Sequence, residues 1–239
     1  MSERVLIIGA AGGIGQACVG LMAGAGWHVI AADLTEAPGG AESHILDVTN
    51  PEACTALAER TGPVDAVIYA AGIVATMPIA RTDPAVWRRI MAVNLDGAAH
   101  VCAAFTGPMI TEGKGGAIIL ISSAAGVRGE AMASAYSASK AGLIALVQSM
   151  AAELTPHQIR VNAVAPGNVD TPMLRAVARD IAKAGGDDEA EVWKSFAHTG
   201  AAQRLVQPGE VARVCMALCS PEFSAVTGTT IPVDAGYLL

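Results

Sequence analysis

VLIIGAAGGIG, residues 5–15 of the 239-residue chain, joins a short apolar strand to a turn built mostly of glycine and alanine. A run without charged residues follows, and its composition suits a helix. A glycine-rich turn in this strand-to-helix setting is typical of sites that bind a dinucleotide. Gly9, Gly13 and Gly15 let the backbone turn tightly, and they let a pyrophosphate approach the first N–H groups of the helix. An ordinary glycine-rich turn without a ligand is the alternative.

Apolar runs of strand length recur along the chain, with helical stretches between them. Continuous rather than alternating apolar character predicts strands that are covered on both faces, as in a parallel sheet. The expected strands are residues 5–8, 29–32, 43–46, 64–71, 117–121, 161–165 and 230–233, and the expected helices are residues 14–25, 52–60, 85–105, 135–154 and 209–218. Asn50-Pro51 and Asp83-Pro84 mark two helix starts, because each places a capping side chain before a first-turn proline. The alternation predicts an α/β fold with a doubly wound parallel sheet between two helical layers, formed by residues 1–239 as one domain.

The second expected strand ends at Asp33, eighteen positions after Gly15, and dinucleotide-binding folds carry an acidic residue at about 20. A carboxylate there can accept hydrogen bonds from both ribose hydroxyls. It would repel a 2′-phosphate, and no Arg or Lys lies within residues 34–46 to compensate, so NAD is favoured over NADP. A local strand-end cap is the alternative role for Asp33. Asp47 and Val48, after the next strand, are candidates for the edge and the face of the adenine.

Tyr136 and Lys140 lie four residues apart at the start of an expected helix, so their side chains share one face. An ammonium group beside a phenol stabilises the phenolate and lowers its pKa from about 10, which brings proton transfer nearer to neutral pH. Ser123 comes thirteen residues before Tyr136, at the end of an apolar strand, where ligands bind in open α/β sheets. Its hydroxyl can hydrogen-bond a substrate oxygen on which charge develops. Ser122 should face the other way, because side chains alternate along a strand.

The chain resembles the short-chain dehydrogenase/reductase family over nearly its whole length. The resemblance rests on ordered motifs: Gly9-x-x-x-Gly13-Ile14-Gly15, Ala70-Ala71-Gly72, Val93-Asn94, Ile121-Ser122-Ser123, Tyr136-x-x-x-Lys140, and Pro166-Gly167 followed by Thr171-Pro172. It implies a Rossmann fold and hydride transfer between NAD and a carbinol carbon. Two departures concern supporting hydrogen bonds: Ile8 stands where a threonine is usual, and Tyr69-Ala70 where two asparagines are common.

The resemblance also implies roles for individual residues. Tyr136 would be the acid/base, Ser123 would polarise the carbonyl, and Lys140 would lower the tyrosine pKa and hold the nicotinamide ribose. Asn94 would hold a water that links Lys140 to solvent. Together with Tyr136 and Lys140, the residues expected at the cofactor are Gly9, Gly13, Ile14, Gly15, Asp33, Asp47, Val48, Ala71, Gly72, Pro166, Gly167, Val169 and Thr171. A homotetramer is implied as well.

Residues 173–205 interrupt the regular alternation, because they are more polar and carry a glycine pair between two helical pieces. We expect a substrate lid at about residues 171–205, hinged near Gly185 and Gly186. The side chains expected to face the substrate are Met173, Trp193 or Phe196. A helical hairpin on the surface is the alternative.

The composition limits the classes of partner. A formal net charge of -7, from 15 basic and 22 acidic residues, gives no electrostatic footprint for nucleic acid or an anionic membrane. The five cysteines lack Cys-x-x-Cys spacing, so we expect neither a metal site nor a disulfide framework, and a reducing, cytoplasmic location. Residues 5–32 lack Asp, Glu, Lys and Arg, but their seven glycines and their strand-turn-helix pattern argue against a signal peptide or a membrane span.

We therefore expect a soluble, NAD-dependent oxidoreductase that interconverts a secondary alcohol and a ketone. The substrate stays open between a 3-hydroxyacyl thioester, a cyclic diol and a simple secondary alcohol, and Arg128 or Glu130 could recognise a polar group on it or could be solvated. Two other classes remain. Ser137-x-x-Lys140 matches a serine-hydrolase signature whose companion motifs are absent, and a non-catalytic NAD(H)-binding sensor could use the same fold.

Overall fold

The computed structural model describes residues 2–239, and a parallel sheet of seven strands runs through it. The strands lie in the order β3-β2-β1-β4-β5-β6-β7, so the chain winds outward from β1 in both directions. Their bounds are β1 Arg4–Ile8, β2 His28–Asp33, β3 Glu42–Ile45, β4 Ala66–Tyr69, β5 Gly116–Ile121, β6 Ile159–Pro166 and β7 Thr230–Val233. This order confirms the predicted doubly wound parallel sheet.

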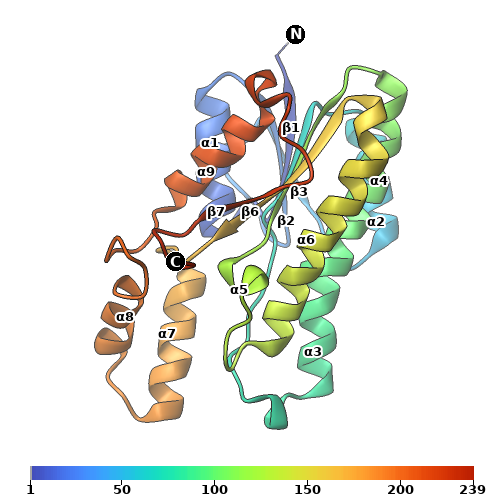
Figure 1. The fold of residues 1–239 in the computed structure, drawn as a ribbon. Helices are drawn as coiled ribbons and strands as arrows, with labels where there is room; N and C mark the ends of the chain where they lie inside the picture. Colours follow the sequence, from blue (N-terminus) through green and yellow to red (C-terminus); the bar gives the residue numbers. More distant parts are fainter. Residues whose placement is uncertain (1) are drawn as a thin grey trace.

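Helices cover the sheet on both faces, as Figure 1 shows. One face is covered by α1 (Gly13–Gly24) and α9 (Pro208–Cys219), and the other by α2 (Pro51–Thr61), α4 (Gly97–Glu112) and α6 (Ser134–Leu154). Alternate residues of β1 point to different layers: Val5 and Ile7 pack with α1 and α9, whereas Leu6 and Ile8 pack with the opposite group. This double burial explains why the strands are continuously apolar, and it confirms the predicted three-layer α/β/α architecture.

Both predicted helix caps form. The Asn50 side chain accepts a hydrogen bond from the Ala53 nitrogen at 2.9 Å, and the Asp83 side chain accepts one from the Ala85 nitrogen at 2.7 Å. The expected strand over residues 64–71 is shorter in the structure, because it begins at Ala66 and ends at Tyr69. The structure adds elements that the sequence did not predict: the short helix α5 (Ala124–Val127) and the single 3-10 turns η1 (Ile79–Arg81), η3 (Thr155–His157) and η4 (Pro221–Phe223).

The single regular helix expected over residues 85–105 is wrong in detail. Helix α3 (Pro84–Met91) runs into a π-helical turn, η2 (Ala92–Asp96), and only then into α4. A π turn interrupts the regular pattern of main-chain hydrogen bonds. Here the buried hydroxyl of Tyr69, at the end of β4, donates to the Val93 carbonyl inside the turn. Contact with the neighbouring strand therefore supports the irregular turn.

The region expected to be a lid is a pair of helices, α7 (Pro172–Gly185) and α8 (Glu189–Ala197). They meet after Gly186, whose φ of 75° lets the chain reverse direction. Trp193 packs edge-on against Phe196, and the Arg175 guanidinium lies 4.1 Å from the Trp193 ring centre. Figure 1 shows the pair, in light orange and brown, extending away from the sheet beside the C terminus.

The uncharged N-terminal stretch forms two neighbouring strands of the sheet and the helix between them. Residues 5–32 supply most of β1, all of α1 and most of β2, as their strand-turn-helix pattern predicted. Within residues 2–239, no helix combines the length and the apolar character needed to cross a membrane.

Candidate active site

The glycine-rich turn lies between β1 and α1, at the carboxyl edge of the sheet. Gly9 has a φ of 77°, and a Cβ there would come within 2.4 Å of the Ala71 nitrogen. A Cβ at Gly13 would come within 2.7 Å of Thr171, so two walls of the site approach each other closely at this point. Helix α1 begins without a side-chain cap and without an acidic residue in its first turn. Its first N–H groups and its dipole are therefore suited to an anionic ligand.

Asp33 ends β2, and its carboxylate reaches the glycine-rich turn. Oδ2 accepts a hydrogen bond from the Ala11 nitrogen at 2.9 Å, and Oδ1 accepts one from the Leu34 nitrogen at 2.7 Å. The local capping role considered from the sequence is therefore present. A carboxylate oxygen has more than one acceptor site, so these two bonds do not prevent the same side chain from binding a ribose, and that role stays a prediction.

Asp47 and Val48 follow β3 at the far end of the predicted cofactor site. Asp47 accepts hydrogen bonds from the Thr49 nitrogen at 2.9 Å and from its hydroxyl at 2.7 Å, and these bonds hold the pKa of the carboxyl below its usual value. Val48 is only 7% exposed and packs against Gly97 of α4. Its side chain offers little surface to an adenine, so the predicted contact through Val48 has weaker support than the one through Asp47.

Ser123, Tyr136 and Lys140 line one cavity at the carboxyl end of β5. Tyr136 and Lys140 lie in the first two turns of α6, with Lys140 Nζ 5.8 Å from the Tyr136 ring centre. Ser123 is the N-cap of α5, where its hydroxyl accepts a hydrogen bond from the Ala125 nitrogen at 3.1 Å. Ser122 also borders this cavity but is buried, and its hydroxyl donates to the Lys140 carbonyl at 2.8 Å. The two neighbouring serines thus have different contacts, with Ser122 bracing the helix that carries Lys140.

Burial sets the pKa values of the tyrosine and the lysine. Lys140 is 4% exposed, its Nζ donates to the Ile121 carbonyl at 2.8 Å, and burial lowers its pKa to about 8. Burial raises the pKa of the Tyr136 phenol; the Ser123 hydroxyl opposes this rise and the Glu130 charge adds to it. The expected lowering of the phenol pKa by Lys140 stays a prediction, since the Lys140 ammonium donates here to the Ile121 carbonyl.

Asn94 lies in the π turn η2 and is fully buried. Its Oδ1 accepts from the Ile73 nitrogen at 2.8 Å, and its Nδ2 donates to the Ile73 carbonyl at 2.9 Å and to Ser139 Oγ at 3.0 Å. Ser139 in turn donates to the Tyr136 carbonyl at 2.7 Å. The amide therefore ties the segment after β4 to the helix that carries Tyr136. The water that the family resemblance assigns to Asn94 stays a prediction.

The cavity has a volume of about 250 Å³. It reaches from the start of α1 to the lid helices, and the predicted cofactor residues that line it are Ile14, Gly72, Tyr136, Lys140, Pro166, Gly167, Val169 and Thr171. Gly9, Gly13 and Gly15 belong to the adjoining glycine-rich turn, and Ala71, after β4, lies against Gly9. Asp33, Asp47 and Val48 do not line the cavity. The predicted site therefore consists of residues that line this cavity and residues that lie outside it, at the end of β2 and after β3.

The lid helices form one wall of this cavity. Met173 and Phe196 line it, as expected, together with Leu174 and Val177. Trp193 does not line it, because its ring is packed between Arg175 and Phe196. The hairpin is thus both a helical pair on the surface and a cover for the cavity. Movement about Gly185 and Gly186 stays a prediction.

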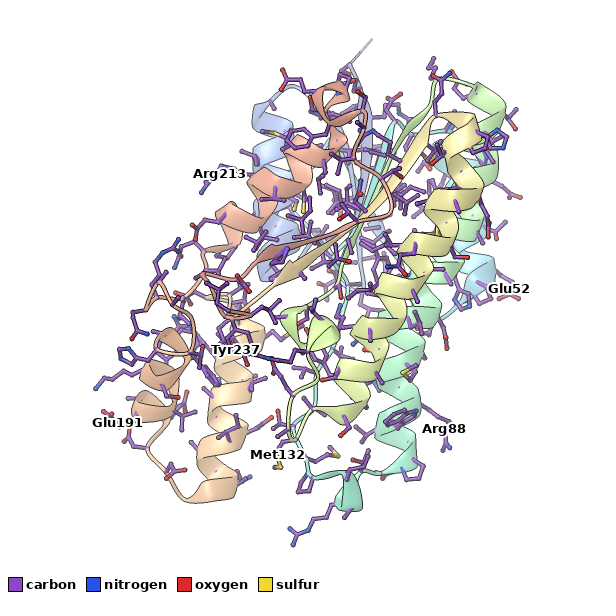
Figure 2. The ribbon with its side chains drawn as sticks, in the orientation of Figure 1. Glu52, Arg88, Met132, Glu191, Arg213 and Tyr237 are labelled. Atoms are coloured by element: carbon purple, nitrogen blue, oxygen red, sulfur yellow. The ribbon has the colours of Figure 1, made fainter. Side chains whose placement is uncertain are left out.

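Several lining residues had no clear sequence signal, namely Thr76, Asn168, Thr199 and Tyr237. Tyr237 reaches the cavity because β7 pairs with β6, which brings the C-terminal residues beside Pro166 and Gly167. Figure 2 shows Tyr237 on the side of the molecule where α5 and α7 lie. Its place depends on strand order, which no local pattern records. Glu130, whose role was left open, lines the cavity, whereas Arg128 does not.

The serine-hydrolase alternative is contradicted by the geometry of Ser137. This residue is mostly buried, its hydroxyl accepts a hydrogen bond from the Glu130 nitrogen at 3.2 Å, and it does not line the cavity. Its hydroxyl therefore faces neither a substrate site nor the Lys140 ammonium, which bonds to Ile121.

The chemistry of the site fits a nicotinamide dinucleotide. The uncapped start of α1 suits a pyrophosphate, Asp33 at the end of β2 suits a ribose, and the wall from Pro166 to Thr171 faces Tyr136 and Lys140 across one cavity. The close approaches at Gly9 and Gly13 leave no room for side chains in this turn. The arrangement can hold a dinucleotide and place a phenol and a hydroxyl beside its reactive end.

Comparisons with known proteins agree with this geometry. Residues 9–238 match the protein family described as Enoyl-(Acyl carrier protein) reductase. The chain is 36% identical over 243 residues to 2-keto-3-deoxy-L-fuconate dehydrogenase from Xanthomonas campestris, covering 98% of this chain and 80% of that protein. It is 34% identical over 253 residues to cis-4-hydroxycyclohexanecarboxylate dehydrogenase from Sinomonas cyclohexanicum, covering 99% and 97%.

Among solved structures, the chain is similar to the ligand-free aldohexose dehydrogenase of Thermoplasma acidophilum. The TM-score is 0.91 with 31% sequence identity, and the match covers 99% of this chain and 94% of that one. Fold, site and relatives agree, and the chain therefore belongs to the short-chain dehydrogenase/reductase family, as an oxidoreductase that acts on alcohol and ketone groups.

Proposed function

We propose that this oxidoreductase interconverts a secondary alcohol and a ketone with NAD, using Tyr136 as the acid/base. The observation that carries the proposal is the cavity itself, where Ser123, Tyr136 and Lys140 share one space with the wall that ends at Thr171. A bound nicotinamide would supply the acceptor for the hydride that leaves the carbinol carbon. The non-catalytic sensor has no support from the relatives, which are named as dehydrogenases.

In alcohol oxidation, the Tyr136 phenolate takes the hydroxyl proton while the substrate oxygen becomes a carbonyl. Ser123 donates a hydrogen bond to the same oxygen, which holds it at the phenol and stabilises the charge that develops there. In the reverse direction, the neutral phenol returns the proton. Because burial raises the phenol pKa, the free enzyme is prepared for the proton-donating direction.

Lys140 has two tasks in the proposal. With a pKa of about 8, it is still mostly protonated at neutral pH and carries a positive charge into a buried site. Its Nζ leaves the Ile121 carbonyl, or shares it, to hold the nicotinamide ribose. That position would bring the charge closer to the phenol oxygen and lower the Tyr136 pKa in the complex, because an opposite charge favours the phenolate.

The choice of NAD over NADP rests on Asp33. A carboxylate at the end of β2 can accept bonds from both ribose hydroxyls and would repel a phosphate on the 2′-oxygen. Residues 34–46 contain no Arg or Lys that could bind such a phosphate. Two main-chain N–H groups already fix the Asp33 side chain, so it does not need to be ordered when the ribose binds.

The proposal also covers the oligomeric state, the cellular location and the class of substrate. Family likeness supports a homotetramer. The five cysteines are all unpaired and buried, which supports a reducing, cytoplasmic location. The relatives named above act on a keto-deoxy sugar acid and a hydroxycycloalkane carboxylate, and the structural neighbour acts on aldohexoses. Cyclic or polyhydroxylated alcohols are therefore the first compounds to test, with and without a carboxylate.

The first experiment follows nicotinamide absorbance while secondary alcohols are offered with NAD or NADP. We expect turnover with NAD, and Tyr136→Phe should lower kcat at least about a hundredfold while NADH binding, followed by fluorescence, stays within about twofold. Turnover that survives Tyr136→Phe would reject the assignment of the acid/base.

The second experiment addresses the cofactor. Asp33→Ala should narrow the preference for NAD over NADP, whereas Glu36→Ala removes an exposed carboxylate from the same loop and should leave the preference unchanged. A wild-type protein that binds NADP more tightly than NAD contradicts the proposed role of Asp33.

A further inference from the structure

Charge is distributed unevenly over the described residues that line the cavity. Glu130 is the carboxylate among them, and Lys140 is the cationic side chain. Lys140 is buried, and its Nζ is bonded to the Ile121 carbonyl beneath the site. A negatively charged group on a substrate would therefore be repelled by the Glu130 carboxylate. The cation among the described lining residues, Lys140, is buried at the place proposed for the nicotinamide ribose.

Glu130 is held in place by its own main chain. Its nitrogen donates to the Ser137 hydroxyl at 3.2 Å, and Ser137 directly follows Tyr136 in α6. The backbone at Glu130 is thus tied to the helix that supplies the acid/base, and Glu130 lines the same cavity as Tyr136. The same proximity has an electrostatic effect, because the Glu130 charge raises the pKa of the Tyr136 phenol.

The neighbouring cation is directed elsewhere. Arg128 does not line the cavity; its guanidinium donates to the Tyr237 carbonyl at 2.9 Å and lies 5.3 Å from the Tyr237 ring centre. Tyr237 does line the cavity; burial raises the pKa of its phenol, the Glu130 carboxylate adds to this rise, and Arg128 opposes it. Arg128 thus holds Tyr237 in place beside Glu130. Glu130 and Tyr237 line the same cavity, one with a carboxylate and the other with a phenol.

The rest of the wall is uncharged. Polar groups come from Thr76, Ser123 and Thr199, and apolar surface comes from Leu174, Val177 and Phe196 of the lid. A molecule with an apolar face and a hydroxylated edge matches such a cavity. A hydroxyl that donates to a carboxylate forms a charge-assisted hydrogen bond, whereas a second carboxylate beside Glu130 would be repelled while it loses its hydration.

We propose that Glu130 is a specificity-determining residue that accepts a hydrogen bond from a second hydroxyl of the substrate, so that the substrate is an uncharged diol or polyol rather than a hydroxy acid or a phosphorylated compound. The inference rests on the proposed function, since the first hydroxyl is the one that reacts at Tyr136 and Ser123. Specificity then arises both from the bond to a hydroxyl and from repulsion of an anion.

The test uses the full-length protein with NAD and three matched alcohols: cyclohexanol, 1,2-cyclohexanediol and 2-hydroxycyclohexanecarboxylate. A six-carbon sugar alcohol and its aldonate form a second pair. We expect kcat/KM for each diol or polyol to exceed that of the matched acid at least tenfold. Glu130→Gln should lower kcat/KM for the diol at least about tenfold, as expected when the acceptor of a hydrogen bond loses its charge. It should change kcat/KM little for cyclohexanol when each protein is assayed on the plateau of its own pH profile.

Glu191→Gln is the matched control, because Glu191 is an exposed carboxylate on the outer lid helix, pairs with Lys194 and does not line the cavity. It should leave the ratios of kcat/KM between diol, acid and cyclohexanol unchanged. Glu130→Arg should reverse the preference between diol and acid. If either Glu130 variant fails to fold, the wild-type ratio of diol to acid still decides the inference.

The possible failures can be told apart. No turnover of any alcohol with NAD or NADP would overturn the proposed function and the inference with it. Turnover of cyclohexanol with equal or better use of the acid than of the diol would overturn the inference alone. An unchanged diol preference in Glu130→Gln would overturn the role of Glu130.

Discussion

Removal of the Tyr69 hydroxyl should destabilise the protein without touching the cavity. The side chain is 0% exposed, it does not line the cavity, and its hydroxyl donates to the Val93 carbonyl inside the π turn that carries Asn94. Burial raises the pKa of this phenol far above its ordinary value, so the group is a neutral donor at every pH at which the protein is studied. Tyr69→Phe keeps the ring and leaves the Val93 carbonyl without its partner.

The expected cost follows from that loss. A buried polar group left unsatisfied costs about 1–3 kcal/mol. For a chain of this size, each kcal/mol corresponds to roughly 2–4 °C in Tm. Tyr69→Phe should therefore lower Tm by about 2–12 °C and lower the urea midpoint while leaving the m-value unchanged. Because the π turn positions Asn94, whose amide reaches Ser139 beside Tyr136, we also expect a drop in kcat with little change in NADH binding.

The chain contains three tyrosines, so the same Tyr→Phe change at the other two positions serves as a control for Tyr69→Phe. Tyr237→Phe removes a hydroxyl that is partly exposed at the cavity, so its effect on stability should stay within about 0.5 kcal/mol. Tyr136→Phe should abolish turnover with a similarly small effect on stability. Equal thermal shifts in Tyr69→Phe and Tyr237→Phe, or none in Tyr69→Phe, would refute the reasoning about the π turn.

Three further perturbations have definite expected results. Gly97→Ala places a Cβ 2.6 Å from the Tyr69 hydroxyl and should lower the free energy of unfolding by about 1–3 kcal/mol. Gly20→Ala lies in open space on α1 and should raise it by up to about 1 kcal/mol. Urea denaturation of both variants measures these two changes. Arg204 and the Gln207 nitrogen lower the pKa of Glu210 to about 2. The ionised Glu210 therefore stabilises the folded protein fully above its ordinary pKa of 4.5, and this contribution is lost as the pH falls toward 2. Glu210→Gln should accordingly cost about 1 kcal/mol at neutral pH and progressively less below pH 4.5. Glu130→Gln removes a charge that raises the Tyr136 pKa, so the pH profile of alcohol oxidation should move to lower pH, and a shift to higher pH would contradict this.

The sequence predicts the architecture because its main determinants are local. Continuous apolar runs such as residues 117–121 reflect burial on both faces, and both predicted caps, at Asn50 and Asp83, form with the expected geometry. The pairing of Tyr136 with Lys140 is likewise local, because four residues make one turn of a helix. Position at the end of a strand was enough to place Ser123 at the cavity, whereas the bond from Ser122 to the Lys140 carbonyl was not predicted.

The features that escaped prediction depend on contacts between distant segments. The π turn that carries Asn94 involves Tyr69, which lies 24 residues before Val93, at the end of strand β4. Tyr237 enters the cavity through the pairing of β6 with β7, and Val48 is covered by α4 at Gly97. The bond from Lys140 to the Ile121 carbonyl was not predicted either, since a shared helix face brings Lys140 near the Tyr136 ring but does not fix where its Nζ donates.

The most direct measurement for the role of Tyr136 is a crystal structure of the protein with NADH and a substrate-like ketone. We expect the nicotinamide between Thr171 and Tyr136, the Lys140 Nζ within hydrogen-bond distance of the ribose hydroxyls, and the ketone oxygen bonded to both the Tyr136 phenol and the Ser123 hydroxyl. A dinucleotide bound outside this cavity, or a ketone oxygen out of reach of the Tyr136 phenol, would contradict it.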